Sequence, residues 1–281
     1  MALRPAFATA PQSERTEPST AAPTQRFSLF PSERVAISVV IPTLNEASRI
    51  EDALDSVRWA DQVIVVDGGS SDKTVLLAKQ KGAETLIIRD RTIAEQRNAG
   101  IARARNHWVL ALDADESVTP ELWASLARLA SASGSSPSAF RIRSRNWHLG
   151  RELRYGPWGR DWKVRVFSRD QRYAIQKVHE SLELLDDVGM LEGALIHHPY
   201  RDVSHQVSKI ATYARWAADD LRTRGRRPRL RDLLVRPAWR FVRDYVVMSG
   251  WRDGAPGFVV SAVSAFSVFL KYACLAMPAE R

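Results

Sequence analysis

The spacing of hydrophobic residues in the first half of the chain alternates between that of strands and that of helices. Short β-branched runs, such as residues 37–41 before Pro42, are typical of strands buried on both faces. Stretches with apolar residues three or four positions apart lie between these runs, as in helices that cover a sheet. The strands are predicted at residues 37–41, 62–67, 84–88 and 108–112, and the helices at 50–57, 74–81 and 92–105. This order predicts an α/β fold with a mostly parallel central sheet flanked by helices.

The pattern of the second half is different. Residues 140–147 and 163–168 alternate in polarity, which predicts strands with one wet face, and an aromatic, glycine-rich loop at 155–162 lies between them. From Val203 onward the spacing is helical. One predicted helix has an apolar face formed by Val203, Val207, Ile210, Ala214, Ala217 and Leu221, and a second carries Leu233, Leu234, Phe241 and Tyr245.

The last apolar run, residues 258–277, is long enough to be considered as a membrane span. Its polar residues recur at helical spacing on one side and are Ser261, Ser264, Ser267 and Lys271. A helix with such a stripe is more typical of a membrane interface, or of packing on a domain, than of a span. We therefore expect a disordered tail at 1–34, a globular domain at 35–200 and a helical, basic and amphipathic C-terminal region at 201–281.

Two carboxylates follow the predicted strand at 108–112. Asp113 and Asp115 are two positions apart, so in an extended chain they lie on the same side. Such hard oxygen ligands suit Mg²⁺ or Mn²⁺, with water and phosphate oxygens completing the coordination. The alternative is that the pair caps the next helix, but Thr119 and Pro120 already provide a helix start.

Further polar residues follow the other predicted strands. Thr43, Asn45 and Glu46 come after the first strand and Asp67 ends the second, so all lie at the carboxyl ends, where ligands bind in such sheets. The alternative is that these residues are ordinary turn formers. No glycine-rich phosphate loop is present, so a diphosphate would be held by metal and by cations. Arg97 and Arg91 are candidates for that role, and the alternative for each is a solvated helix charge.

Composition adds a charge argument. The 281 residues include 41 Lys and Arg against 32 Asp and Glu, a net charge of +9, and six arginines lie within residues 222–231. This excess points to a phosphate-rich or anionic-membrane partner. The single cysteine, Cys274, excludes an internal disulfide, and residues 1–34 contain no apolar core of a secretory signal.

Four motifs in sequence order resemble family 2 glycosyltransferases of the GT-A fold. They are Val-Val-Ile-Pro-Thr-Leu-Asn-Glu at 39–46, Val-Ile-Val-Val-Asp-Gly-Gly-Ser-Ser-Asp-Lys-Thr at 63–74, Gln-Arg-Asn-Ala-Gly at 96–100 and Leu-Asp-Ala-Asp-Glu at 112–116. The second half is similar to the bacterial branch that adds glucose to the inner core of lipopolysaccharide, through Val-His-Glu-Ser-Leu at 178–182, His-His-Pro-Tyr at 197–200 and Asp-Gly-Ala-Pro-Gly-Phe at 253–258.

The resemblance implies an inverting transferase with a UDP-sugar donor, a Mg²⁺ or Mn²⁺ ion and a lipid-linked saccharide acceptor, peripheral to the cytoplasmic face of the inner membrane. The region 35–200 is then the catalytic domain. The implied donor-binding residues are Pro42, Thr43, Asn45, Glu46, Asp67, Gly69, Arg97 and Asp113, and the implied metal ligands are Asp113 and Asp115.

The resemblance implies the catalytic base less directly than the donor-binding residues. The family's Glu-Asp pair is absent, and Glu180 replaces it by position, with Asp161 as the next choice. The processive Gln-x-x-Arg-Trp motif is also absent, which favours transfer of a single sugar. Two alternatives remain: a transferase that loads sugar onto polyprenyl phosphate, and a nucleic-acid-binding protein, suggested by the isoelectric point near 10. The latter lacks a recognised nucleic-acid motif, so we expect no nucleic-acid partner.

Overall fold

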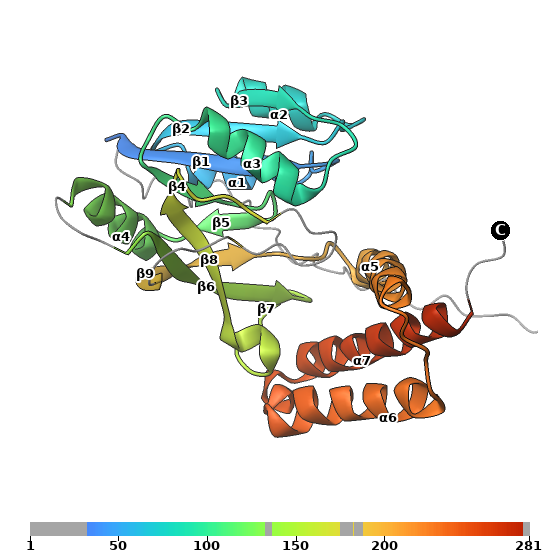
Figure 1. Ribbon diagram of the computed structural model, residues 1–281. Coiled ribbons are helices and arrows are strands. Elements are labelled where there is room, and N and C mark those ends of the chain that lie inside the picture. The colour runs from blue at the N-terminus through green and yellow to red at the C-terminus, as the bar shows by residue number, and fades with distance from the viewer. Residues whose placement is uncertain (1–32, 133–136, 175–181, 183–187, 278–281) are drawn as a thin grey trace, which may run out of the picture.

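The computed structural model describes residues 33–132, 137–174, 182 and 188–277, and its centre is one mixed β-sheet (Figure 1). The strand order is β3-β2-β1-β4-β8-β6-β9-β5, with the short β7 beside β6. The strands are β1 (Val35–Thr43), β2 (Ala60–Asp67), β3 (Glu84–Ile87), β4 (Trp108–Ala111), β5 (Glu116–Val118), β6 (Ala139–His148), β7 (Arg151–Glu152), β8 (Asp161–Ser168) and β9 (Val188–His197).

The first half of the sheet is parallel, as the sequence predicts. β1 pairs with β2 and β4, and β2 pairs with β3, all in parallel register. Central β1 is buried over nearly its whole length, which explains why its sequence is a β-branched run without alternation. Because these strands share one direction, their carboxyl ends lie at a common edge of the sheet.

The second half adds antiparallel pairs to this sheet. β8 runs antiparallel to β4 and to β6, whereas β9 is parallel to β6 and antiparallel to β5. The predicted wet face of β6 is confirmed, since Arg141 and Arg143 are exposed and Ile142 is buried. The antiparallel pairing places β8 directly beside β4, the strand that leads to Asp113 and Asp115.

Helices cover both faces of the sheet, as predicted. On one face α1, α2 and α4 enclose the larger apolar core with Ile37, Leu110 and Leu126, and on the other face α3 packs over Val40 and Val66. Thr119 caps α4 through the backbone N–H of Leu122. The helices of this domain are α1 (Ile50–Ser56), α2 (Thr74–Gln80), α3 (Ile93–Arg103) and α4 (Pro120–Ser131), with a short 3-10 turn at Pro157–Arg160.

The C-terminal region is helical, and its long helix α7 packs on α5 and α6 (Figure 1). A small core of Ala218, Tyr272 and Leu275 joins α5 to α7. The elements are α5 (Val203–Thr223), α6 (Leu230–Phe241), a π-helical turn at Val242–Val247, a 3-10 turn at Gly250–Asp253 and α7 (Ala255–Ala276).

The start of α5 is exposed, although it carries part of the predicted apolar face. Val203 and Val207 are 40% and 39% exposed, and the buried residue of that segment is Gln206. Buried alanines follow further along, at Ala214 and Ala218. Ala218 packs with Tyr272 and Leu275 of α7, and helical spacing alone does not show where along a helix such a contact lies.

The polar stripe of α7 faces the protein. Ser261 is buried and its hydroxyl donates to the carbonyl of Gly257, while the Lys271 ammonium lies over the ring of Tyr272. Within the described part of the chain, α7 is the one helix long and apolar enough to cross a membrane, and only 22% of that apolar stretch is buried in the structure. Much of the apolar side of α7 therefore faces outward.

A glycine in β9 allows a direct test of how β9 packs against α4. Gly193 has a φ of +92°, and a Cβ there would lie 2.2 Å from the backbone nitrogen of Leu122. We expect Gly193→Ala to reduce the free energy of unfolding by about 3 kcal/mol, because both backbone strain and overpacking against α4 oppose it. Gly82→Ala is the matched control, since Gly82 has a φ of +79° and open space around it. Urea denaturation should show a loss of about 1 kcal/mol for this control; equal losses in both variants would contradict the packing argument.

Candidate active site

The turns after β1 and β2 form one hydrogen-bonded unit at the carboxyl edge of the sheet. Asp67, only 1% exposed, accepts a hydrogen bond from the Thr43 hydroxyl at 3.1 Å. Its other oxygen accepts the backbone N–H groups of Gly69 and Ser70 at 2.8 and 2.7 Å. The Asp67 carboxylate therefore fixes the shape of the loop that follows it.

The turn after β1 is held by the same loop. Asn45 has a φ of 56°, and its side-chain oxygen accepts the backbone N–H of Ser71 at 2.9 Å. The backbone N–H of Glu46 donates to the Thr74 hydroxyl at 2.8 Å. The structure thus brings the predicted donor-binding residues of the two turns to one edge; they are Pro42, Thr43, Asn45, Glu46, Asp67 and Gly69.

Asp113 lies between two guanidinium groups. Arg97 from α3 contacts one carboxylate oxygen at 2.5 Å, and Arg165 from β8 contacts the other. Arg165 also donates to the fully buried Glu116 at 2.8 Å, and Glu116 in turn accepts the backbone N–H of Asp113. Burial alone favours the neutral acid, but Arg165 and then Arg97 hold the pKa of Asp113 well below its usual range. Asp113 is therefore an anion with both oxygens already engaged.

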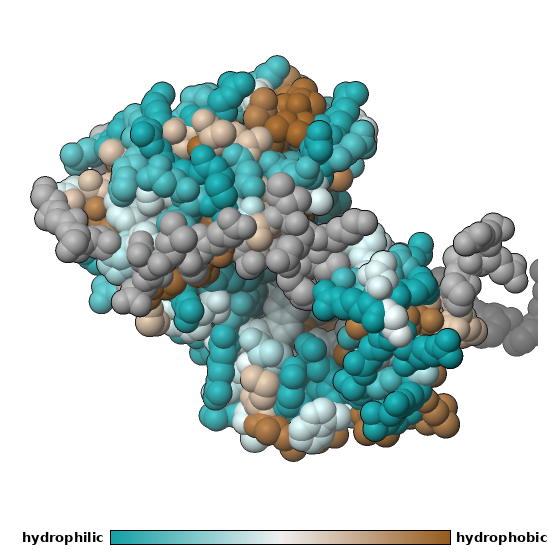
Figure 2. All heavy atoms as spheres, in the orientation of Figure 1, coloured by the Kyte–Doolittle hydropathy of each residue, from teal (hydrophilic) through white to brown (hydrophobic). Residues whose placement is uncertain are grey.

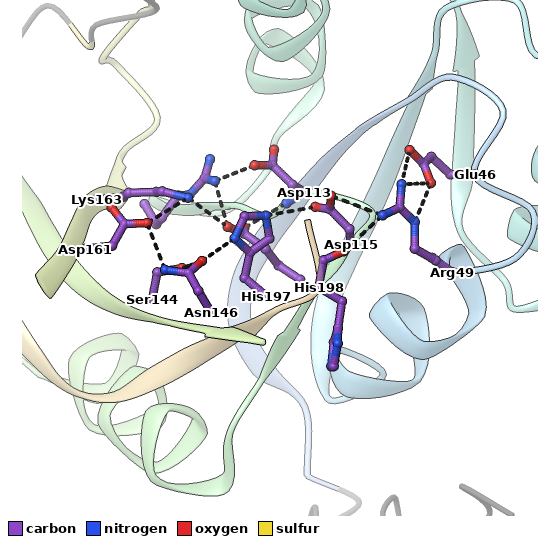
Figure 3. A network of polar contacts seen from close by, with 12 residues as sticks. Glu46, Arg49, Asp113, Asp115, Ser144, Asn146, Asp161, Lys163, His197 and His198 are labelled. Carbon is purple, nitrogen blue, oxygen red and sulfur yellow. Dashed lines mark hydrogen bonds and ion pairs between the residues drawn. The ribbon is translucent and has the colours of Figure 1, made fainter. Parts of the chain in front are cut away.

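Asp115 has a weaker set of partners. Arg49 lies 3.4 Å from one oxygen, and the His197 Nε2 atom lies 3.6 Å from the other (Figure 3). Burial, followed by repulsion from Asp113 and Glu116, raises the pKa of Asp115 to about 7. This carboxylate is the group in the cluster that most lacks a positive partner.

Asn146 determines which nitrogen of His197 carries the proton. The Asn146 amide nitrogen donates to the carbonyl of Trp158 at 2.7 Å, so its oxygen is the atom that faces His197 Nδ1 at 2.6 Å. His197 must then donate from Nδ1. Burial lowers the pKa of His197 to about 4, so the ring is neutral and the lone pair of Nε2 points toward Asp115. Two acceptor atoms, a ring nitrogen and a carboxylate oxygen, face each other across a gap that a cation would fill.

Asp161 and Lys163, at the start of β8, form the other side of the cluster (Figure 3). The Lys163 ammonium lies 3.4 Å from Asp161 and 3.7 Å from Glu116, and the Asn146 amide lies 3.4 Å from Asp161. A carboxylate of the second half is thus linked through Asn146 and His197 to Asp115. Asp161, the second choice of base, therefore lies in contact with this cluster.

The remaining residues with predicted roles differ in the contacts that they make. Arg97 is buried and contacts Asp113, whereas Arg91 lies just before α3 as an exposed charge that pairs with Glu95. Glu180 lies outside the described residues. The interpretation of Asp113 and Asp115 as helix caps is wrong, because Thr119 caps α4.

Six residues of the cluster had no predicted role: Arg49, Glu116, Asn146, Lys163, Arg165 and His197. Arg165 was within a strand whose polar positions were assigned to water, but the polar side of β8 faces Asp113. His197 is part of the motif His-His-Pro-Tyr at 197–200, but the sequence does not show that it faces Asp115. Across residues 33–132, 137–174, 182 and 188–277, no three or more His, Cys, Asp or Glu side chains gather to form a complete metal site.

Comparison with known proteins agrees with the sequence resemblance. The family model for glycosyl transferase family 2 matches residues 38–181. A glycosyltransferase of Rickettsia bellii is 30% identical over 251 residues, which cover 85% of each chain. The lipopolysaccharide core biosynthesis glycosyltransferase LpsC of Rhizobium meliloti is 28% identical over 84% of this chain and 90% of its own.

Solved structures are more distant. TarS 1-349 of S. aureus aligns with a TM-score of 0.45 and 14% identity over 84% of this chain and 91% of its own. The glucosyl-3-phosphoglycerate synthase of Mycobacterium tuberculosis, in complex with phosphoglyceric acid, aligns with a TM-score of 0.46 and 21% identity over 66% and 79%. The family match spans both predicted donor turns and the Asp113–Asp115 segment, on a sheet of the GT-A kind. The chain belongs to glycosyl transferase family 2 and is a glycosyltransferase.

Proposed function

We propose that this enzyme transfers one sugar, glucose by resemblance, from a UDP-sugar to the core saccharide of a lipopolysaccharide or another cell-envelope lipid. The reaction inverts the anomeric carbon and takes place at the cytoplasmic face of the inner membrane. The observation that carries the proposal is the facing pair of Asp115 and His197 beside the two donor turns. The similarity to LpsC over most of both chains supports a lipopolysaccharide acceptor.

The residues present fit a divalent cation. Asp115 supplies a hard oxygen of the kind that Mn²⁺ and Mg²⁺ prefer. His197 is held by Asn146 in the tautomer that presents Nε2, and this softer nitrogen ligand favours Mn²⁺ over Mg²⁺, with phosphate oxygens and water to complete the coordination. Asp113, predicted as a second ligand, has both oxygens on arginines, so we assign it to orienting the 113–116 segment. A bound cation would neutralise the charge that develops on the departing diphosphate.

The chain's own residues have distinct tasks in this proposal. The turns containing Thr43, Asn45 and Asp67 form a preformed support for the nucleoside, since each is already fixed by hydrogen bonds. Arg49 contacts both Asp115 and the carbonyl of His198, so it holds the loop after β9 close to the diphosphate position. Preorganised charge of this kind contributes without rearrangement during the reaction.

UDP release from a panel of UDP-sugars with Mn²⁺ tests this function, using Asp115→Asn as the variant. We expect UDP-glucose to be used, and the variant to lose about 10²-fold or more in turnover because the cation loses its anionic ligand. Asp55→Asn, on the surface pair with Lys81, is the control and should keep wild-type turnover. A near-normal rate for Asp115→Asn at saturating metal would contradict the metal site. Acceptor arms with lipopolysaccharide core and with polyprenyl phosphate separate the proposed acceptor from the alternative one.

The raised pKa of Asp115 predicts a pH dependence of metal affinity. Below about pH 7 the metal must displace a proton from Asp115, so the apparent affinity should fall about tenfold per pH unit. Above pH 7 Asp115 is ionised and the affinity should level off. His197, with its pKa lowered to about 4, stays neutral through this range. The metal concentration for half-maximal UDP release, measured from pH 5.5 to 8.5, checks this; a constant value across pH 7 would contradict it.

The base is tested with two matched variants, because inversion requires a carboxylate on the acceptor side to take the hydroxyl proton. Glu180 is the predicted base, and Asp161 is the acid that the cluster links to His197. We expect Glu180→Gln to reduce transfer by about 10²-fold with UDP-sugar affinity within a few fold, and Asp161→Asn to have a much smaller effect. The reverse ranking in single-turnover transfer assays would move the base to Asp161.

A further inference from the structure

Two acidic side chains of the α6–α7 region are buried, whereas many of its large apolar side chains are exposed. Asp232 of α6 and Asp244 of the following π-helical turn are each only 1% exposed, and they pair with Arg236 and Arg240, both at 2.5 Å. The Arg236 guanidinium also lies over the ring of Tyr272 on α7. The guanidinium groups therefore cover the two carboxylates, and one of them also packs against α7.

Large apolar side chains are exposed on both helices and on the turns between them. Val235 and Trp239 on α6 are 62% and 58% exposed, and Phe266 on α7 is 43% exposed. Figure 2 shows apolar atoms at the lower edge of the molecule, where α6 lies in Figure 1. The further large apolar side chains exposed on this face are Leu234, Val242, Val246, Val247, Trp251, Phe258 and Phe269. Hereafter these ten residues are called the outer face.

A groove runs along the outer face between the two helices. Apolar residues alone line it, and they are Pro237, Ala238, Phe241, Val242, Ala262, Ala265, Phe266 and Phe269. A surface of this kind is unfavourable in water, because many large apolar side chains stay hydrated. The exposed apolar residues therefore point to an apolar surrounding for this face.

Positive charge lies at one end of the outer face. The six arginines of residues 222–231 precede and begin α6, where their charge complements anionic headgroups. Trp239 and Trp251 add the amphipathic rings that are enriched at membrane interfaces. We propose that the outer face of α6 and α7 inserts into an anionic lipid bilayer, with the helices lying in the membrane plane. This deepens the membrane part of the proposed function, and it does not depend on the sugar-transfer chemistry.

The insertion places the acceptor beside the active site. The Asp253 carboxylate, just before α7, accepts the backbone N–H groups of Arg154 and Tyr155 at 3.1 and 2.9 Å. The Arg252 guanidinium lies 4.3 Å from the centre of the Tyr155 ring. These contacts attach the membrane-facing helices to the loop that leads to Asp161. A lipid-linked acceptor at the bilayer surface would therefore lie on the Asp161 side of the cluster.

Flotation of the full chain with lipid vesicles tests the insertion. We expect binding to vesicles of phosphatidylcholine with phosphatidylglycerol at 0.1 M NaCl, with a loss of up to about tenfold at 0.5 M as the arginine attraction is screened, but with residual binding because the inserted apolar face is not screened. Vesicles of phosphatidylcholine alone should bind about tenfold less. Val235→Glu with Trp239→Glu should lower the fraction bound to anionic vesicles by at least tenfold. The matched control is Leu76→Glu with Ile87→Glu, which adds the same charge at two residues 53% and 54% exposed on α2 and β3, and it should bind as the wild type does.

A second readout avoids any doubt about folding of the charged variant. Lipids brominated on the acyl chains should quench tryptophan fluorescence of the wild type, and Trp239→Phe with Trp251→Phe should remove most of that quenching. Three results would overturn the insertion. The Glu variant could float with vesicles as well as the wild type does, binding could be lost completely in 0.5 M NaCl, or the brominated lipids could leave tryptophan fluorescence unquenched. A solution mass that falls from dimer to monomer in the Glu variant, without vesicle binding by the wild type, would assign the face to a second copy of the chain.

Discussion

The active-site architecture depends on one buried ion cluster, in which Arg165 contacts both Asp113 and Glu116. Arg165 comes from the antiparallel half of the sheet, and both carboxylates follow the parallel half. Removing one partner of such a cluster leaves an uncompensated buried charge, at a cost of about 3–5 kcal/mol. The cluster therefore joins the donor-binding half of the domain to the half that carries Asp161 and His197, and it fixes the backbone between Asp113 and Glu116.

The two carboxylates at 113 and 115 show how neighbours decide a role. Two guanidinium groups satisfy Asp113, which stays ionised, whereas Asp115 has only the more distant Arg49 and two negative neighbours. The same residue type, two positions apart, is thus a structural anion in one case and an anion short of positive charge in the other. The Nε2 lone pair of His197 faces Asp115, so His197 offers a second ligand for the proposed cation.

The C-terminal helices extend the catalytic domain in a way that suits a lipid-borne acceptor. Two of their carboxylates are covered by arginines, and many of their large apolar side chains are exposed. Asp253 ties this region to the loop before β8, so the proposed membrane surface is linked to the segment that leads to Asp161. The family match ends at residue 181, before this region, and the alignments with the relatives from Rickettsia bellii and Rhizobium meliloti cover 85% and 84% of the chain.

The sequence by itself determined the features that depend on local physics. The spacing of hydrophobic residues determined the parallel strands and the helices between them. Thr119 and Pro120 determined where α4 begins. Because the first two strands are parallel neighbours, Thr43 and Asp67 at their carboxyl ends lie together. Tertiary structure alone decided the contacts between segments far apart in the chain: Arg165 on Asp113, His197 opposite Asp115 and the inward stripe of α7. Periodicity states that a strand or helix has a polar side, but whether that side meets water, a carboxylate or another helix is set by which distant element packs against it.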